Sequence, residues 1–283
     1  MNHKAFTLVE LAIVMTIIGL LIGGILKGQE LLENARVTST IAQVKSYDAA
    51  TTAFRDIYGG LPGDLRDAGN RIPGCIATCT PVYESANRYT AGDGYVAGDV
   101  LEVLGSGNLA LNIPANSIYD EKFLFWIHLL KANLIAGVSD IGLTELTESA
   151  WGITNPTAKI GGGFNVGSDI AAASDGFVLP GSSVSPAQSV AGYQGSLQLW
   201  VQSRPPTNNG SENLSTTAGS NPLTPSRAEQ IDRKMDDGNP GSGSVLAYGV
   251  TNSCFMNGSA ANTFVYNGSV SSKDCGLMFR LQN

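Results

Sequence analysis

Few side chains in this 283-residue sequence are suited to acid–base catalysis. There are two histidines, His3 and His128, and His128 stands in the apolar segment EKFLFWIHLLKANLIAG. A histidine among such neighbours is more commonly a packed residue than a catalytic base. The residue spacings typical of serine hydrolases, P-loop proteins, zinc proteases and EF-hands do not occur. The sequence therefore predicts a protein that is not an enzyme.

Carboxylates gather near residue 236. Asp232 and Asp236 have helical spacing, and Asp236 and Asp237 begin the turn Asp-Asp-Gly-Asn. Hard oxygen ligands of this kind suit calcium. The commoner alternative is a solvated helix end followed by a turn. We expect no cofactor and keep calcium at Asp236 and Asp237 as a hypothesis.

Glu10 occupies the most unusual position of any carboxylate in the chain. It is the one charged residue between Phe6 and Leu26, a run of 21 residues. As a helix this run would be about 31 Å long, enough to cross the hydrocarbon core of a bilayer. A charge at the centre of such a segment costs about 2.5 kcal/mol or more. The position of Glu10 therefore needs an explanation.

Three interpretations compete for this N-terminal segment. A secretory signal peptide has a shorter apolar core followed by a small-residue cleavage site, whereas here Lys27 follows the run directly. A plain membrane anchor explains the length but not the acid. Cleavage between Ala5 and Phe6 would remove a short basic leader and leave Glu10 near a new amine on Phe6. Because a buried charge is tolerated better with a partner, the third interpretation is favoured.

The stretch AFTLVEL, followed by about twenty apolar residues, resembles the N-terminus of type IV pilins and type II secretion pseudopilins. In that family a prepilin peptidase cuts before the phenylalanine and methylates its amine, and the glutamate pairs with a neighbouring subunit. The resemblance implies these roles for Phe6 and Glu10. Ala5 stands where the family usually has glycine, and Lys27 stands where many members have a helix-kinking proline.

Four glycines in the apolar run have GxxxG spacing, which lets membrane helices approach closely: Gly19, Gly23, Gly24 and Gly28. Glycine is also simply common in membrane helices. Both interpretations fit a helix packed in a filament core.

The four cysteines suit an exported chain, in which an even number indicates disulfides. We favour the pairs Cys75–Cys79 and Cys254–Cys275 among the three possible pairings. The second would close a loop of about twenty residues, worth roughly 3 kcal/mol, and the resemblance supports it because pilins commonly close a C-terminal loop this way. Zinc is the alternative, but the spacings differ from C-x2-C and no histidine adjoins either pair in the sequence.

Charge predicts the topology and disfavours one class of partner. The net charge is −7, which argues against a broad electrostatic grip on nucleic acid. Lys4 and the amine on the leader side place the N-terminus in the cytoplasm, with membrane lipid around the apolar run. We therefore expect a single-pass bacterial inner-membrane protein whose head is periplasmic, or extracellular after assembly.

Past the membrane the helix is expected to continue to Tyr58, where Gly59-Gly60-Leu61-Pro62 ends it. Its apolar positions recur at steps of three and four. They are Val37, Ile41, Val44, Tyr47, Ala50, Phe54 and Ile57. The predicted organisation is a leader at 1–5, a long helix at 6–58 with 6–26 spanning the membrane, and a head at 59–283.

The head is predicted to be mainly antiparallel sheet, which makes the fold class α+β. Strand-like runs occur at 196–202, 244–250, 263–266 and 277–281. A helix is expected in EKFLFWIHLLKANLIAG, ended by Gly137, and another after Thr224 as its cap and Pro225 in its first turn, ended by Gly238.

Two classes of function follow. The favoured one is a structural pilin or pseudopilin, minor rather than major because a bulky head repeats less easily along a filament. The alternative is a minor pilin at the filament tip that acts as an adhesin or binds a secreted substrate or DNA. Expected partners are other pilin or pseudopilin subunits, prepilin peptidase and the inner-membrane assembly platform. The choice among secretion, pilus and DNA-uptake machines stays open.

Overall fold

A computed structural model describes residues 8–75, 79, 96, 121–139, 150–167, 197–205, 217–250, 252–257 and 264–281. The predicted leader at 1–5 and the new N-terminus at Phe6 lie outside these residues. Within them the fold has a long helix, three shorter helices and six strands. The predicted α+β class, with a long N-terminal helix on an antiparallel sheet, is confirmed.

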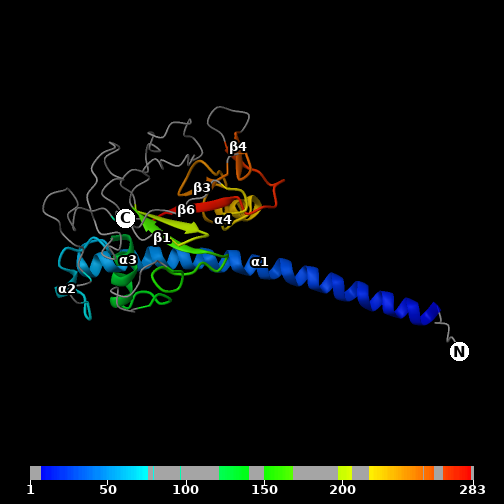
Figure 1. Ribbon diagram of the computed structural model, residues 1–283, viewed down its shortest axis with the longest axis horizontal. Coiled ribbons are helices and arrows are strands. Elements are labelled where there is room, and N and C mark those ends of the chain that lie inside the picture. The colour runs from blue at the N-terminus through cyan, green and yellow to red at the C-terminus, as the bar shows by residue number, and fades with distance from the viewer. Residues whose placement is uncertain are drawn as a thin grey trace.

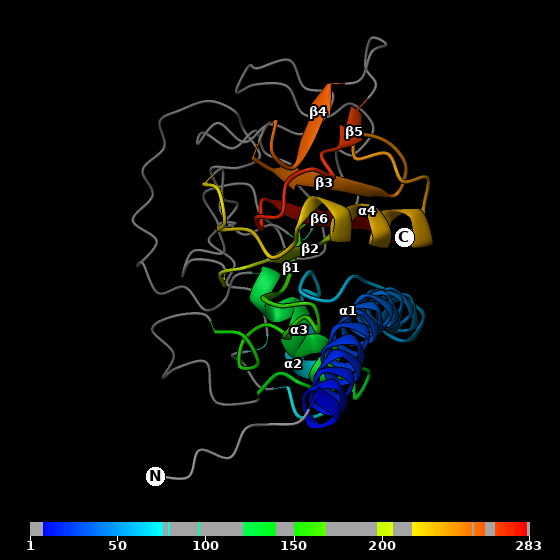
Figure 2. The ribbon, with the colours of Figure 1, turned by 90° about the vertical axis from the view of Figure 1, so that its right-hand side faces the viewer.

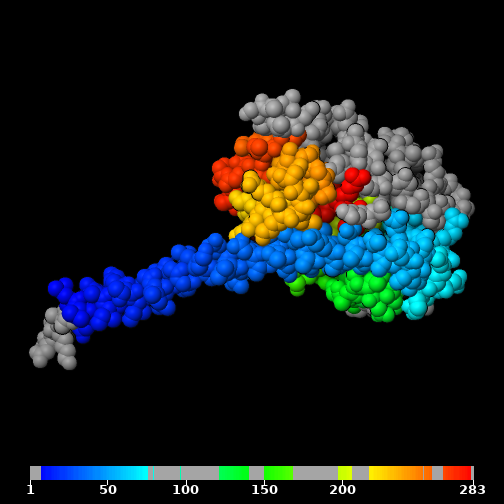
Figure 3. All heavy atoms as spheres, turned by 180° about the vertical axis from the view of Figure 1, so that it is seen from behind, coloured from blue at the N-terminus to red at the C-terminus, as the bar shows by residue number. Residues whose placement is uncertain are grey.

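Helix α1, Leu8–Tyr58, contains 51 residues and is therefore about 77 Å long. Its N-terminal part projects from the head as an exposed stem, which is blue in Figures 1 and 3. The first buried residue of the helix is Val37. The helix ends where Gly59 takes a φ of 69° and its N–H donates to the carbonyl of Arg55 at 2.7 Å.

The buried stripe of α1 follows the predicted spacing except at its end. Its buried residues are Val37, Thr40, Val44, Tyr47, Ala50, Thr51 and Phe54. Ile57 was predicted in this stripe but is 62% exposed. Tyr58 packs against the core in its place, because a stripe that follows 37, 44 and 51 reaches 58 and not 57 on the same face.

Two short helices complete this end of the head: α2, Ala68–Arg71, and α3, Glu121–Lys131. The prediction that α3 runs on to Gly137 is wrong. Asn133 takes a left-handed φ of 58°, and the N–H of Leu134 reaches back to the carbonyl of Leu129 at 3.0 Å. Asparagine tolerates this conformation, and the helix ends six residues before Gly137.

The main sheet has the order β1-β2-β6-β3, and all of its neighbouring strands are antiparallel. The strands are β1 Gly163–Gly167, β2 Gln198–Gln202, β3 Val245–Gly249 and β6 Cys275–Arg280. A second sheet pairs β4, Phe255–Asn257, with β5, Phe264–Tyr266. Strands β1 and β4 were not predicted. Both are short, and β1 is bounded by glycines that carry no strand signal.

One face of the main sheet forms the core with the helices. Alternate residues along the strands, among them Phe164, Leu199 and Phe279, belong to the same buried cluster as Val44 and Phe54 of α1. Figure 2 shows α1 and α3 together on one side of the sheet.

Helix α4, Pro225–Met235, packs against α1 as well as against strands of both sheets. Thr224 precedes it, but its side chain makes no capping hydrogen bond, contrary to the prediction. Its backbone carbonyl accepts from the N–H groups of Arg227 and Ala228 instead. The helix ends at Met235, three residues before Gly238.

Candidate functional site: the N-terminal stem and two buried polar clusters

Glu10 lies in the first turn of α1 and is exposed. Around it the stem presents large apolar side chains to the outside, including Leu11, Ile13 and Val14, each more than half exposed. The helix is long and apolar enough to cross a membrane, and its most apolar window buries nothing against the head. Ala5 and Phe6, the predicted cleavage residues, lie outside the described residues.

The four stem glycines leave a smooth helix surface. At Gly19, Gly23, Gly24 and Gly28, an added Cβ would meet no heavy atom within 4 Å apart from the helix's own nearby backbone. Their role in close helix packing therefore concerns contacts with other chains, and it stays a prediction.

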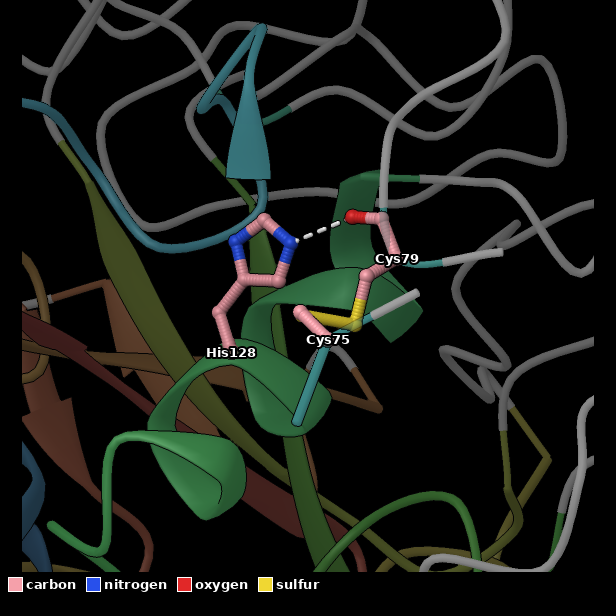
Figure 4. Close-up of side chains that lie close together, drawn as sticks. All are labelled: Cys75, Cys79 and His128. Carbon is pink, nitrogen blue, oxygen red and sulfur yellow. Dashed lines mark hydrogen bonds between the residues drawn. A yellow bond between two sulfur atoms is a disulfide. The ribbon is translucent and has the colours of Figure 1, made fainter. Parts of the chain in front are cut away.

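The cysteines are joined as the sequence analysis favours, Cys75 to Cys79 and Cys254 to Cys275. The fold brings His128 of α3 to the first of these pairs (Figure 4). Its Nε2 donates to the carbonyl of Cys79 at 2.7 Å, and the N–H of Gly63 donates to its Nδ1 at 2.8 Å. In the sequence, no histidine adjoins either cysteine pair. Because 49 residues separate His128 from Cys79, no local spacing could have indicated the contact.

His128 is fully buried and stacks on Phe54. Burial lowers its pKa to about 4, although the hydrogen bond to the Cys79 carbonyl opposes that shift. The imidazole is therefore neutral at pH 7, and both ring nitrogens are engaged. Such a histidine connects the turn at Gly63 to the Cys75–Cys79 loop, and it has no free lone pair with which to accept a proton or hold a metal.

The acidic cluster at the end of α4 organises the loop that follows. Asp236 Oδ2 accepts from the backbone N–H groups of Ser244 and Val245. Asp237 accepts from the Asn239 N–H at 2.8 Å and from the Ser242 hydroxyl at 2.6 Å. The three carboxylates, including Asp232, lie close enough to share a cation. Since these hydrogen bonds already use oxygens of Asp236 and Asp237, calcium there stays a hypothesis.

Asp232 is the buried member of this cluster. Its Oδ2 accepts from the Tyr266 hydroxyl at 2.8 Å, and its Oδ1 accepts from the Gly238 N–H at 3.1 Å. Burial raises its pKa to about 7, with a smaller contribution from Asp237 and Asp236, while the two hydrogen bonds oppose the shift. The hydrogen bond between Asp232 and Tyr266 links α4 to β5. Nothing in the local sequence indicates this contact.

Comparison with known proteins finds similarity at the N-terminus. Residues 1–26 match the model of the prokaryotic N-terminal methylation motif. This span contains Ala5, Phe6 and Glu10 and ends where the predicted membrane segment ends. No curated protein and no solved structure matches the chain.

Proposed function

We propose that this chain, which carries the prokaryotic N-terminal methylation motif characteristic of type IV pilins and pseudopilins, is a structural subunit of a type IV pilus or type II secretion filament. The observation that carries the proposal is the coincidence of this motif with an exposed apolar stem. The motif covers residues 1–26, and the helix that continues from it buries none of its most apolar window in the head.

The geometry suits a subunit that packs by its stem. Apolar side chains from Leu8 to Leu26 are exposed on the isolated chain, so membrane lipid before assembly and neighbouring stems after it would cover them. In either surrounding Glu10 needs a positive partner. The amine of Phe6 on a neighbouring subunit supplies one, and the pair would set the axial register.

Processing and topology follow from the same motif. Prepilin peptidase would cut between Ala5 and Phe6 and methylate the new amine. The stem would then hold the chain in the bacterial inner membrane with its N-terminus cytoplasmic and its head periplasmic. Assembly would involve other subunits and the inner-membrane platform. This role needs no catalytic residue and no cofactor.

We infer a minor rather than a major subunit. The head comprises the 225 residues from 59 to 283, so it is bulky to repeat along a filament. The alternative, a tip subunit that binds a surface or a secreted substrate, uses the same stem and processing.

Mass spectrometry of the mature protein, together with its copy number in sheared filaments, tests the proposal. We expect an N-methylated Phe6 as the first residue and a low copy number in the sheared fraction. A retained Met1, or a cut after the apolar run, would remove the basis of the proposal. A copy number equal to that of the main subunit would contradict the minor role.

A further inference from the structure

The carboxylate of Asp274 is fully buried, directly before the disulfide-bonded Cys275, and it collects three hydrogen bonds. Its Oδ2 accepts from the hydroxyls of Ser253 and Ser272, and its Oδ1 accepts from the N–H of Gly219 at 2.6 Å. Burial raises the pKa of this carboxyl, but the three hydrogen bonds outweigh burial and leave the pKa below its ordinary value of 3.8. Asp274 is therefore ionised at pH 7, and hydrogen bonds to an ionised acceptor are stronger than neutral ones.

The hydrogen bond between Ser253 and Asp274 runs beside the second disulfide. Ser253 directly precedes Cys254 in the chain. In the same way, Asp274 directly precedes Cys275. The hydrogen bond and the disulfide therefore join adjacent positions of the same two segments, each across 21 positions of sequence. We call the hydrogen-bonded pair Ser253 and Asp274 the serine–aspartate clamp.

Backbone hydrogen bonds connect the same two segments by a second route. The N–H of Val250 donates to the carbonyl of Asp274 at 3.0 Å, and the N–H of Cys254 donates to the carbonyl of Val250 at 2.8 Å. These bonds hold Val250 and Cys254 against the start of β6, where Gly249 of β3 pairs with Cys275. Neither these bonds nor the clamp includes a sulfur atom, so they can form before the disulfide does.

We propose that Asp274 is a positioning residue for disulfide pairing. By holding Ser253 beside it, the carboxylate places the thiols of Cys254 and Cys275 against each other before the bond forms. Four cysteines allow three pairings, and the clamp selects one of them. The other two cysteines are only four positions apart. Since closing a longer loop costs more chain entropy, a contact that closes the 21-position loop first favours the pairing of Cys254 with Cys275.

The clamp acts on a thiol–disulfide exchange whose oxidant is another disulfide, for which oxidised glutathione is the simplest example. One cysteine thiolate of the chain attacks this oxidant, which forms a mixed disulfide and releases one glutathione. The second cysteine then attacks the protein sulfur of the mixed disulfide, closes the Cys254–Cys275 bond and releases the second glutathione. Two thiols of the chain are oxidised, one molecule of oxidised glutathione is reduced, and the two protons pass to the two glutathione thiols. The clamp raises the effective concentration of one cysteine at the other in the second, intramolecular attack.

The effective concentration is measured with the full-length chain in a zwitterionic detergent. The background variant Cys75→Ser/Cys79→Ser leaves one possible disulfide, and the chain is equilibrated with mixtures of reduced and oxidised glutathione at pH 7. We expect Ser253→Ala to lower the effective concentration about tenfold, the size expected for one hydrogen bond to a charged group. Ser272→Ala is the matched control. Ser272 donates to the same carboxylate oxygen but from the Cys275 side of the clamp, so its removal should change the effective concentration by less than about twofold.

Two further variants separate positioning from a general loss of structure. Ser253→Thr keeps the hydroxyl and should recover most of the effective concentration that Ser253→Ala loses. Because the serine acts through the aspartate, adding Ser253→Ala to Asp274→Ala should lower the effective concentration no further. After refolding of the four-cysteine chain with oxidised glutathione, non-reducing peptide mapping should find more of the other two pairings in Ser253→Ala than in wild type. An unchanged effective concentration in Ser253→Ala, an equal loss in Ser272→Ala, or no recovery in Ser253→Thr would overturn the proposal.

Discussion

Glu10 lies in the first turn of an exposed apolar helix, where a carboxylate is costly unless it is paired. If it were only a helix residue, Glu10→Ala would be neutral or favourable, since alanine has the higher helix propensity. If it pairs with the Phe6 amine of a neighbouring subunit, the same change leaves that amine alone in an apolar core. Loss of one partner of a buried pair costs about 3–5 kcal/mol.

We therefore expect Glu10→Ala to lower the ratio of sheared-filament to membrane-held protein at least tenfold. Cleavage and membrane insertion should continue, because in the proposed processing they depend on Ala5, Phe6 and the apolar run. Glu10→Gln should restore little of this ratio, since glutamine keeps the shape of the glutamate side chain but not its charge. Normal assembly of Glu10→Ala with a folded head would show that the carboxylate does not set the register.

Asp232 makes the stability of the head depend on pH. Burial raises its pKa to about 7 in the folded chain, above the ordinary value of 3.8. The folded state therefore binds the proton more tightly than the unfolded state does. This contribution to stability is fully present below pH about 4 and is lost as the pH rises through about 7.

Asp232→Asn should remove that dependence. The amide carries no charge and keeps one oxygen for the Tyr266 hydroxyl, but it loses the hydrogen bond from the Gly238 N–H. The variant should therefore be less stable than wild type at pH 4 and should lose less stability than wild type between pH 4 and pH 8. Urea unfolding of both proteins at pH 4, 6 and 8 measures the effect. Asp56→Asn, at an exposed carboxylate on α1, is the control. Parallel pH profiles for wild type and Asp232→Asn would contradict this account.

At the scale of elements, the Cys254–Cys275 disulfide joins the residue before β4 to the first residue of β6. The two cysteines are separated by 21 positions, whereas Cys75 and Cys79 are separated by four. In the chain-entropy model the larger loop contributes about 3 kcal/mol and the smaller about 2 kcal/mol. Strand β6 also pairs with both β2 and β3, so its end is central to the sheet.

The double variant Cys254→Ser/Cys275→Ser should lower the free energy of unfolding of the head by about 3 kcal/mol. Membrane insertion should be unchanged, because the stem is separate from this part of the chain. The matched comparison is Cys75→Ser/Cys79→Ser, measured by urea unfolding under the same conditions. If opening the short loop lowers the free energy of unfolding more than opening the long one, then packing around the disulfide, and not loop closure, determines the effect.

Elements with strong periodicity could be predicted from the sequence, and elements made by long-range contacts could not. The end of α1 at Tyr58 follows from Gly59 and Pro62, and strands β2, β3, β5 and β6 follow from their apolar residues. Strand β1 reads as a glycine-rich connection because its stability comes from pairing with β2. The buried stripe of α1 ends at Tyr58 and not at the predicted Ile57, because the packed face of the helix follows a seven-residue spacing.

The same limit applies to the candidate sites. The methylation motif is local, within residues 1–26, and it could be recognised in the sequence by its resemblance to a known N-terminus. The contacts of His128 with Gly63 and Cys79, and of Asp232 with Tyr266, join segments 34 to 65 residues apart. Pairs of this kind depend on how α3 and α4 dock, and no local pattern encodes them.

At the scale of the whole molecule, the stem and the head are separable. The first buried residue of α1 is Val37. Just before it on α1, the Asn34 side-chain oxygen accepts a hydrogen bond from Gln230 of α4 at 2.8 Å. A chain that begins at Glu33 should therefore be soluble without detergent and unfold cooperatively with the stability of the full-length head. Urea unfolding and size-exclusion chromatography measure both properties. A shorter chain beginning at Thr40, which lacks Val37 and the Asn34 contact, should be less stable.

Helix α1 has no proline between Leu8 and Tyr58, and it enters the head without interruption at Val37. In the proposed function, a pull on the N-terminal end as a subunit leaves the bilayer would act along one continuous helix. The load reaches the head through the side chains from Val37 to Phe54, all of which would have to slide past the core at once. Interlocked side chains resist such shear better than they resist being peeled apart in sequence. In the proposed function, this is the direction in which a growing filament would pull the chain.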